Sequence, residues 1–396
     1  MFHQDRRPVS DGICRSAGNG DMGPMSVSSS EYSKDKRTLV IAGGGTGGHL
    51  FPGIAIARQW IREVKDADVL FIVGHRKIET EIISRYGYQT AYIDVEGIKG
   101  RGLNAVNALL KLPVGILQSV RILRSVSPDV VIGMGGYSSG PVCLSARMMG
   151  IPAAIHEQNS YPGVTNRLLA RFVNLAFLSF RDSSKYLKAR SYLLVGTPVR
   201  DEIIRSGESE HRIKKKGFTI LVTGGSQGAR ALNIEVANAL ALLKDMGRDI
   251  NVIHQTGQID YERCLKDYET RGIKADLSPF ITDMASAYNA ADLVISRAGA
   301  SSIFELAALR KPSVLIPYPY AANQHQMANA MSLSRIGAAE VIDQSDLSGP
   351  GLARIIIKYM DNPGMLEDMG QRAGKMARTD AAEQIVNGLK QICSVH

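Results

Sequence analysis

After residue 37, short runs of β-branched and aliphatic residues alternate with longer segments of helical apolar periodicity. A short, continuous apolar run is typical of a strand that is buried on both faces, and helices then cover those faces. The alternation predicts parallel sheets built from strand–helix units. The predicted strands are Leu39–Ala42, Val69–Val73, Thr90–Ile93, Val130–Ile132, Ala153–Ile155 and Leu175–Leu178 in the first half, and Thr219–Val222, Asn251–His254, Leu293–Ile295 and Ser313–Ile316 in the second.

The same pattern divides the chain into two halves of similar architecture. A strand ends near Leu194, Gly196 and Pro198 follow it, and the charged stretch Glu208–Lys216 leads into the second half. We therefore expect a first domain over residues 37–197 and a second over 198–377. The last helical segment, 381–392, has no strand after it, so residues 378–396 are expected to pack back on the first domain.

Residues 1–36 are polar and rich in Ser, Gly, Asp and Arg. They lack the apolar core of a signal peptide. We interpret them as a disordered extension, or as residues upstream of a later start such as Met25. The protein is therefore expected in the cytoplasm.

Two glycine-rich turns occupy corresponding places in the two halves. Residues 43–48 (GGGTGG) follow one predicted strand and precede a helix over 52–60, and residues 224–229 (GGSQGA) follow another and precede a helix over 232–243. Glycines let the backbone turn tightly and lie close to a ligand. The free N–H groups of the following helix favour an anion, most often a phosphate. The duplication predicts two phosphate-bearing substrates that face each other across a cleft.

Four other polar segments follow predicted strands, where parallel sheets usually bind ligands. They are the turn 133–141 (GMGGYSSGP), the segment 156–159 (HEQN), the strand–turn–helix segment 293–305 and the loop 317–329. Ser138 and Ser139 could hold a second face of a diphosphate, and Glu305 could accept hydrogen bonds from two ribose hydroxyls. Purely structural roles remain open for each segment: a tight turn, a helix-stabilised acid, a polar loop or a cap.

Composition narrows the choice of ligand. The 396 residues carry 47 Lys and Arg against 38 Asp and Glu, a net charge of +9, which suits phosphorylated substrates, anionic lipid or nucleic acid. Aromatic residues make up only 6% of the chain and no nucleic-acid motif is present, so we expect no nucleic acid partner. The four cysteines are scattered and are expected to be free thiols in a reducing compartment.

Two other site types are disfavoured. Residues 43–48 also fit the dinucleotide pattern G-x-G-x-x-G, but Gly74, His75 and Arg76 follow the second strand, where an NAD site needs an acid. Asp66-Ala67-Asp68 has the D-x-D form of metal-dependent glycosyltransferases, but it precedes a strand, at the wrong end of the sheet. We interpret it as a solvated turn and expect no metal, since no other ligand spacing is present.

The segment Lys99–Arg124 combines apolar and basic residues, with Leu109, Leu110, Leu112, Val114, Ile116 and Leu117 beside Lys99, Arg101, Lys111, Arg121 and Arg124. This mixture is typical of a patch that binds an anionic membrane surface. A helix that packs on its own sheet would look similar, and both interpretations stay open.

The glycine turns 44–49, 133–141 and 224–229, together with Phe51-Pro52-Gly53, His156–Asn159 and Arg297–Glu305, occur in an order that resembles the MurG family of glycosyltransferases over residues 37 to 393. The resemblance implies the GT-B fold, an α/β fold with two Rossmann-like domains whose parallel sheets face each other across a cleft. It also implies inverting, metal-independent transfer of GlcNAc from UDP-GlcNAc to the C4 hydroxyl of MurNAc in lipid I, with no cofactor. The product would be lipid II, for peptidoglycan synthesis, cell shape and cell division.

The resemblance further implies a peripheral protein on the cytoplasmic face of the inner membrane, with other cell-wall synthesis and division proteins as partners. For the donor it indicates Thr46, Gly47, Gly48, Asn159, Arg200, Ser226, Ile281, Ala300, Ser301, Ser302, Ile303, Phe304, Glu305 and Gln326. Within this set Arg200 and Ser226 would hold the diphosphate, Ile281 the uracil through its backbone, Glu305 the ribose and Gln326 the GlcNAc. The acceptor diphosphate is expected at Gly45, Gly135, Gly136, Tyr137 and Ser138. Thr197 departs from the family, which commonly has Asn there.

His49 is the candidate catalytic base, because an imidazole titrates near neutral pH and a position at the head of a helix disfavours its charged form. A hydrogen bond that only orders the loop is the alternative role for His49, and Glu157 is the second candidate base. Two other functions remain: a UDP-GlcNAc 2-epimerase or another UDP-sugar enzyme of the same fold, and a module that binds a nucleotide sugar without chemistry.

Overall fold

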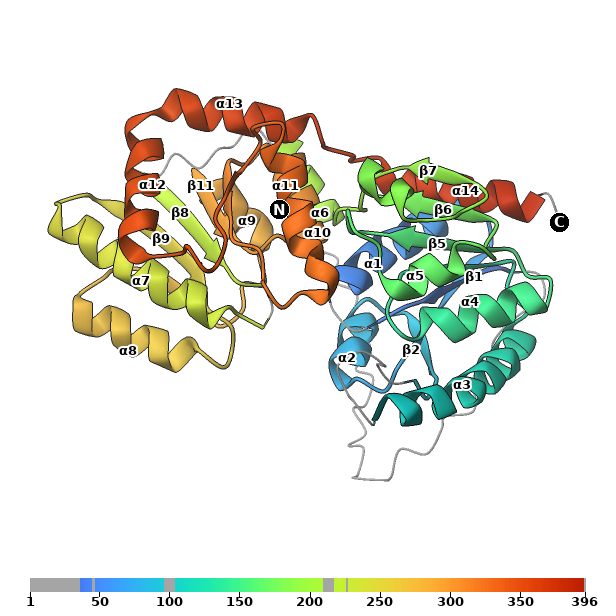
Figure 1. Ribbon diagram of the computed structural model, residues 1–396. Coiled ribbons are helices and arrows are strands. Elements are labelled where there is room, and N and C mark those ends of the chain that lie inside the picture. Colours follow the sequence, from blue (N-terminus) through green and yellow to red (C-terminus); the bar gives the residue numbers. More distant parts are fainter. Residues whose placement is uncertain (1–35, 45–46, 96–103, 209–216, 226, 395–396) are drawn as a thin grey trace, which may run out of the picture.

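The computed structural model describes residues 36–44, 47–95, 104–208, 217–225 and 227–394. The predicted extension 1–36 lies outside these residues apart from Lys36, as do the predicted site residues Gly45, Thr46 and Ser226. The described chain forms two lobes, each with its own sheet and covering helices (Figure 1).

The sheet of the first lobe has seven strands in the order β3-β2-β1-β4-β5-β6-β7, and every neighbouring pair is parallel. In its register Ile41 lies between Phe71 and Ile132. All six strands predicted here are confirmed, with ends shifted by one to two residues. The strands are β1 (Arg37–Ala42), β2 (Ala67–Val73), β3 (Gln89–Tyr92), β4 (Val130–Gly133), β5 (Ala153–Glu157), β6 (Leu175–Leu178) and β7 (Tyr192–Leu194).

The sheet of the second lobe repeats this pattern with six parallel strands in the order β10-β9-β8-β11-β12-β13. The four predicted strands are again confirmed, and two strands at the edges of the sheet, β10 and β13, were not predicted because they are very short and polar. The strands are β8 (Phe218–Thr223), β9 (Ile250–Gln255), β10 (Asp276–Ser278), β11 (Leu293–Ser296), β12 (Ser313–Leu315) and β13 (Glu340–Val341).

Helices cover the faces of both sheets (Figure 1). Those between the strands of the first lobe are α1 (Gly47–Glu63), α2 (Lys77–Arg85), α3 (Asn104–Val126), α4 (Ser139–Met148) and α5 (Val164–Leu169), with the short helix η1 (Arg181–Lys185). The others are α6 (Asp201–Glu208), α7 (Arg230–Asp245), α8 (Tyr261–Arg271), α9 (Met284–Ala290), α10 (Ala300–Ala308), η2 (Ala322–Gln324), α11 (His325–Ser334), α12 (Gly349–Asp361), α13 (Pro363–Gly374) and α14 (Ala381–Ser394).

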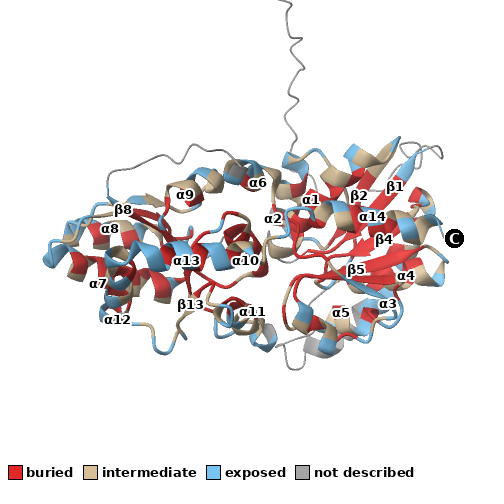
Figure 2. Cartoon of the chain, turned by 90° about the horizontal axis from the view of Figure 1, so that it is seen from above, coloured by how far each residue is buried: buried red, intermediate tan, exposed pale blue. Residues whose placement is uncertain are grey.

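The central strands of each sheet are buried on both faces and are mostly apolar (Figure 2). On one face of the first sheet the core includes Trp60 from α1 and Phe177 from β6. Helix α14, the last of the chain, contributes Ile385, Val386 and Leu389 to this same core, although it follows the second lobe in sequence. Its packing against the first lobe, which the sequence predicted, is thus confirmed.

The chain crosses between the lobes at two places, after β7 and before α14 (Figure 1). We propose that the domain boundaries lie at 197/198 and 377/378. Within the described residues, none of the helices is both long and apolar enough to cross a bilayer.

Candidate active site

Both sheets reverse their strand order at one point, and loops from these two points form the site. In the first sheet β1 lies beside β4, and in the second β8 lies beside β11, although two strands separate each pair in sequence. A crevice opens beyond the carboxyl ends of such strand pairs, and ligands bind there in open α/β sheets. The glycine turns after β1, β4 and β8, and the Arg297–Gly299 turn after β11, all lie at these crevices.

The two glycine turns of the first lobe touch each other. Gly136 has a left-handed backbone (φ +77°), and a Cβ on it would lie 2.4 Å from the carbonyl oxygen of Gly44. The side chains beside this contact differ, since Tyr137 is exposed while Ser138 is buried. Only glycine allows this approach, so the turns predicted for the acceptor diphosphate form one continuous surface.

This contact makes Gly136→Ala a sharp test of the turn. The left-handed φ and the overpacking together are expected to cost about 2 to 4 kcal/mol of unfolding free energy, and the displaced turn should lower acceptor kcat/KM. Urea denaturation and acceptor titration measure the two effects. Gly140→Ala is the matched control, because its Cβ would meet only Thr165 Cγ2, at 3.5 Å, and it lies in α4. Equal behaviour of the two variants would contradict the close-packed turn.

His49 is the third residue of α1, and its ring packs against the second of these glycine turns. A Cβ on Gly135 would lie 3.2 Å from His49 Cε1. His49 Nδ1 lies 3.2 Å from the side-chain oxygen of Gln158. Burial lowers the pKa of His49, and His325 from α11 lowers it further, while hydrogen bonds to Gln158 Oε1 and to the backbone of Met134 raise it in part. The imidazole is therefore neutral at neutral pH and able to accept a proton.

Glu157 is a buried carboxylate inside the first lobe, and local donors satisfy both of its oxygens. Oε1 accepts from the backbone and side-chain amides of Asn159, and Oε2 accepts from Gly163 N and Asn166 Nδ2, at 2.9 to 3.3 Å. Burial raises the pKa of Glu157, and these hydrogen bonds act against that rise. The arrangement favours a role in shaping the loop after β5 over the role of base. His156 and Glu157 also lie within β5, which is two residues longer than predicted.

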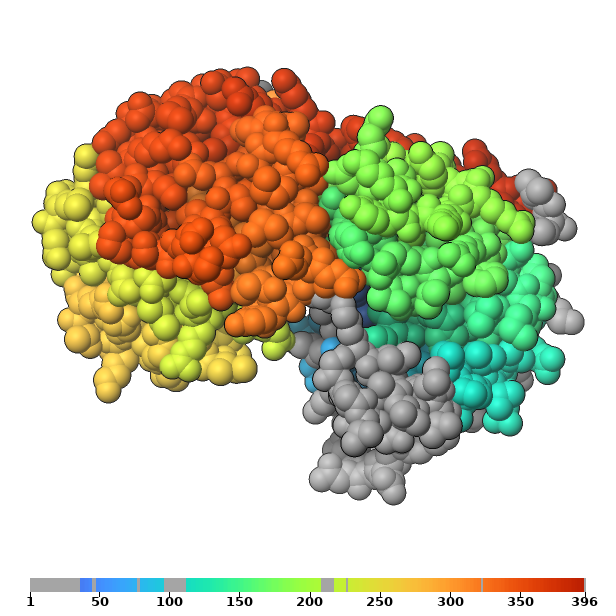
Figure 3. All heavy atoms as spheres, in the orientation of Figure 1, coloured from blue at the N-terminus to red at the C-terminus, as the bar shows by residue number. Residues whose placement is uncertain are grey.

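Hydrogen bonds across the gap join this loop to the second lobe. Asn329, buried in α11, donates to Asn159 Oδ1 (3.1 Å) and accepts from the backbone amide of Ser160 (2.8 Å). Nearby, Ser301 Oγ donates to the carbonyl oxygen of Gly48 at 3.4 Å. Figure 3 shows the orange segment of the second lobe against the green segment of the first. Residues from both lobes that are predicted to bind UDP-GlcNAc, such as Ser301 and Gly48, are therefore in contact across the gap.

Arg200 and Glu305, predicted to hold different parts of the donor, form an ion pair with each other. Arg200 Nη2 and Nε lie 2.8 and 3.0 Å from Glu305 Oε1, and Tyr288 donates its hydroxyl to Oε2 at 3.1 Å. Burial lowers the pKa of Arg200, but the carboxylate outweighs it, so the net pKa is raised. The guanidinium also stacks over Phe51 of α1, with its carbon 5.1 Å from the ring centroid. Arg200 thus stands between the lobes as a permanent cation.

The predicted donor residues of α10 do not all face the site. Ile303 and Phe304 are fully buried in the core of the second lobe, where Phe304 packs edge-on against Phe180. Their side chains point into this core, so the prediction that Ile303 and Phe304 line the nucleotide stays a prediction and rests on the backbone of the helix. Ala300, Ser301 and Ser302 form the first turn of the helix, where backbone N–H groups are free of intrahelical partners and suit an anion.

One polar residue that the sequence analysis did not single out, Gln255, positions residues predicted to bind UDP-GlcNAc. Gln255, at the end of β9, accepts from Ile281 N (2.9 Å) and donates to Gly225 O (3.0 Å), so it joins the second glycine turn to the predicted uracil contact. Gln326, predicted for GlcNAc, accepts from Tyr318 N at 2.9 Å. The position of Gln255 directly after a buried apolar strand was the signal that could have identified it.

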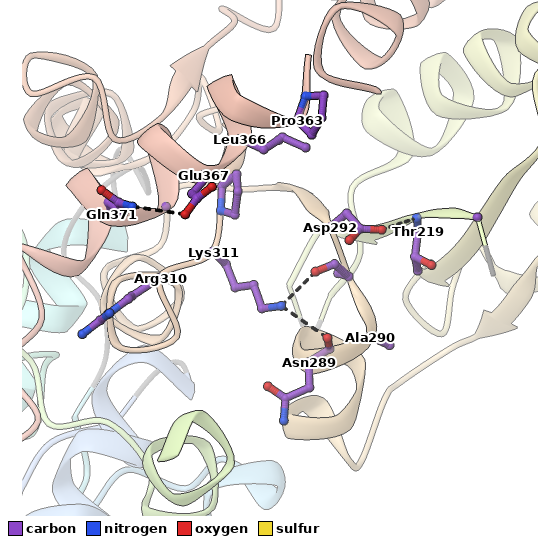
Figure 4. Close-up of a pocket in the computed structure, with 14 residues that line it drawn as sticks. Thr219, Asn289, Ala290, Asp292, Arg310, Lys311, Pro363, Leu366, Glu367 and Gln371 are labelled. Atoms are coloured by element: carbon purple, nitrogen blue, oxygen red, sulfur yellow. Dashed lines mark hydrogen bonds between the residues drawn. The ribbon is translucent and has the colours of Figure 1, made fainter. Parts of the chain in front are cut away.

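A cavity of about 610 Å³ lies elsewhere in the second lobe, at the amino ends of β8, β11 and β12 (Figure 4). Lys311 extends along it and donates to the backbone carbonyl oxygens of Asn289 and Ala291, while Asp292 accepts from Thr219 N. None of the predicted site residues lines this cavity. Because it lies at the edge of the sheet opposite the crevice, we do not assign the donor to it.

No group of three or more His, Cys, Asp and Glu side chains within the described ranges is arranged to hold a metal ion. Asp66-Ala67-Asp68 lies at the amino end of β2, away from the site. Asp68 accepts from Val69 N and pairs with Lys36. The prediction of a solvated turn holds for Asp66 alone, since Ala67 and Asp68 are half-buried and begin β2.

Comparison with known proteins agrees with this geometry. Residues 39–178 match the glycosyltransferase family 28 N-terminal domain, and residues 219–385 match the C-terminal domain. A relative from Syntrophus aciditrophicus (strain SB) is 46% identical over 352 residues, which cover 88% of this chain and 97% of that protein. Its name is UDP-N-acetylglucosamine–N-acetylmuramyl-(pentapeptide) pyrophosphoryl-undecaprenol N-acetylglucosamine transferase.

Comparison with solved structures also shows similarity to MurG. The crystal structure of MurG from Acinetobacter baumannii superimposes with a TM-score of 0.73 and 31% identity, covering 90% of this chain and 99% of that one. A putative UDP-N-acetylglucosamine 2-epimerase from Listeria monocytogenes has a TM-score of 0.63, covering 90% of this chain and 96% of its own. Its identity is only 12%, so that likeness shows the fold alone.

Two Rossmann-like lobes with facing switch points form the GT-B fold, as predicted, and the family 28 domains make the chain a glycosyltransferase. The chain belongs to glycosyltransferase family 28 and, within it, to the MurG family.

Proposed function

We propose that this chain transfers GlcNAc from UDP-GlcNAc to the C4 hydroxyl of MurNAc in lipid I, giving lipid II and UDP for peptidoglycan synthesis. The observation that carries the proposal is the meeting of the two crevices at one gap, bridged by Asn159–Asn329 and Ser301–Gly48. Each crevice offers backbone N–H groups to a phosphate, and this reaction has one diphosphate on the donor and another on the acceptor.

On the donor side, the second lobe holds the UDP-GlcNAc. The diphosphate lies against the first turn of α10, with Ser226 and Arg200 as further donors. Glu305, which is paired with Arg200, accepts hydrogen bonds from the ribose. The backbone at Ile281 contacts uracil, Gln326 contacts GlcNAc, and Thr46, Gly47, Gly48 and Asn159 reach the donor from the first lobe.

On the acceptor side, the paired glycine turns with Gly45, Gly135, Gly136, Tyr137 and Ser138 receive the lipid I diphosphate. The C4 hydroxyl then attacks the anomeric carbon of GlcNAc from the face opposite UDP, so the configuration inverts. His49 takes the hydroxyl proton as the new C–O bond forms. The bond to the UDP oxygen breaks with its electron pair, and Arg200 and the α10 amides stabilise the charge on the departing diphosphate.

A membrane-facing surface would bring lipid I to this site. Helix α3 packs on its own sheet through Leu123 and Val126, but it also presents Leu117, 62% exposed, in line with Arg121 and Arg124. One helix can therefore both pack on its own sheet and offer a surface to an anionic membrane, the two interpretations that the sequence left open. We propose that this outer face rests on the anionic inner leaflet as a peripheral contact, where other cell-wall synthesis and division proteins also act.

Leu117→Glu tests this surface. It replaces an apolar contact with a negative charge, so binding to vesicles that contain anionic lipid should weaken by about tenfold or more, as expected for a lost leucine insertion. Vesicle cosedimentation measures the effect. Met246→Glu is the control, because Met246 is as exposed (61%) but lies in the second lobe, after α7. Equal weakening in both variants would contradict a specific α3 contact.

The function itself is tested with labelled UDP-GlcNAc and a short-chain lipid I analogue, with and without EDTA. Transfer of label to the acceptor would support the proposal. Transfer that continues in the presence of EDTA would show that the reaction needs no metal. Label that stays on UDP in a new sugar epimer would instead support the 2-epimerase, which shares the fold. UDP binding without any turnover would contradict the proposal and would indicate a nucleotide-sugar binding module or an enzyme with a different acceptor.

A further inference from the structure

A chain of hydrogen bonds leads from the carbonyl oxygen of Gly196, between the lobes, through the buried side chains of His156 and Gln158 to His49. His156, in β5, places Nε2 2.9 Å from the carbonyl oxygen of Gly196 and Nδ1 3.0 Å from Gln158 Nε2. Gln158 also donates from Nε2 to the carbonyl oxygen of Met134 at 2.9 Å, and its Oε1 lies 3.2 Å from His49 Nδ1. His156 and Gln158 are almost wholly buried, so water does not supply alternative partners.

The direction of every hydrogen bond in this chain follows from its first member. A carbonyl oxygen only accepts, so the proton of His156 is on Nε2, facing Gly196. Burial holds the pKa of His156 at about 4, so the ring is neutral and its Nδ1 is an acceptor. Gln158 must then donate from Nε2 to both His156 Nδ1 and Met134 O, which uses both of its amide hydrogens.

The orientation of Gln158 in turn fixes the proton on His49. With its NH₂ group committed, Gln158 presents only its oxygen to His49, and an oxygen can only accept. His49 therefore carries its proton on Nδ1, and the lone pair of the neutral ring is on Nε2. The side-chain hydrogen bond of His49 is made through Nδ1, and the backbone of Met134 also hydrogen-bonds the ring and raises its pKa.

We propose that Gln158 is a positioning residue that holds His49 in the Nδ1–H tautomer, so that Nε2 is the atom that accepts the proton of the attacking hydroxyl. The part played by Nε2 in the reaction rests on the proposed function, whereas the tautomer does not. Through Gly196, which has φ +86° and lies where the chain leaves the first lobe, the same chain of bonds links the base to the segment between the lobes.

The tautomer is measured directly by ¹⁵N NMR of the full chain labelled at histidine, since Nδ1–H and Nε2–H imidazoles give different nitrogen shifts. The chain has 8 histidines, and substitution of His49 or His156 by Asn assigns each signal by its loss. We expect His49 as Nδ1–H and His156 as Nε2–H. Observation of His49 as Nε2–H would overturn the proposal, whatever reaction the protein catalyses.

Two variants of Gln158 then test its effect on His49, whose ring also faces His156 and His325. Gln158→Glu places a carboxylate on His49 Nδ1–H and should raise its pKa, whereas Gln158→Met removes the acceptor and should lower it. Both should lower kcat by about tenfold or more, as second-sphere partners of a reacting group do, with the donor KM within about twofold. Gln59→Met, in the same helix as His49, is the control and should change neither value.

The pKa of His49 and the value of kcat together distinguish a failure of the role proposed for Gln158 from a failure of the proposed mechanism. Opposite pKa shifts with no change in kcat would leave the tautomer intact but remove His49 from the reaction, and with it the proposed mechanism. Shifts in the same direction, or no shifts, would overturn the role of Gln158. If Gln158→Met does not fold, the tautomer in the unsubstituted protein and the pKa shift in Gln158→Glu still decide.

Discussion

Replacing His49 by alanine is expected to lower kcat by about 10² to 10⁴-fold, the usual contribution of general base catalysis, while UDP-GlcNAc affinity changes little. Alanine removes the imidazole that packs on the glycine turn at Gly135. Steady-state kinetics with lipid I analogue and calorimetric titration of UDP-GlcNAc measure the two quantities. His75→Ala, an exposed imidazole near β2, is the matched control.

The pH profile adds a second readout. A base must be neutral to work, so kcat rises as pH increases through its pKa. Because burial lowers the pKa of His49, this acid limb should lie below the ordinary value of 6.5, and it should vanish in His49→Ala. If kcat and donor affinity fall equally in this variant, His49 has a structural role in ordering the loop and is not the base.

Arg200→Met is expected to weaken UDP-GlcNAc binding by about 10- to 100-fold, equivalent to ~1.5–3 kcal/mol for a lost charge-assisted hydrogen bond. The same change leaves Glu305 as an unpaired carboxylate beside Tyr288 in the interior. Loss of one partner of a buried pair costs about 3–5 kcal/mol of unfolding free energy. Donor titration and urea denaturation measure the two effects independently.

The double variant Arg200→Met with Glu305→Gln separates ligand binding from folding. Neutralising Glu305 removes the unpaired charge, so stability should largely return, while donor binding should stay weak because both predicted contacts are gone. Recovery of donor binding along with stability would assign the pair a purely structural role. Glu305→Gln alone, which preserves the shape of the side chain, shows how much of the ribose contact needs the charge.

Much of the fold could be predicted because the strands are buried on both faces. Such strands are continuous apolar runs, and a glycine turn at the end of a run marks both the strand end and the ligand edge of the sheet. Strands β10 and β13 were missed because three- and two-residue edge strands, containing Asp276 and Glu340, have no apolar pattern to detect. Their pairing comes from the neighbouring strand, not from their own sequence.

The site was predictable only as far as local sequence determines it. The glycine turns and His49 are readable from strand and helix boundaries, but the partners of polar side chains are not. Asn329 lies 170 residues from the Asn159 to which it donates, and Gln255 accepts from Ile281, which lies 26 residues further along the chain. The inward direction of Ile303 and Phe304 depends on the phase of α10 against its sheet, which the sequence alone left undetermined.

Helix α14 has a consequence for how the protein is made. Three of its side chains complete the core on one face of the first sheet, and Gly388 packs so closely on Phe177 that a Cβ there would lie 2.7 Å from the ring. During synthesis the first lobe therefore cannot finish folding until the second lobe has already emerged from the ribosome. The chain therefore connects the lobes at two places. Two connections allow a hinge motion that opens and closes the gap, but they restrict rotation of one lobe relative to the other.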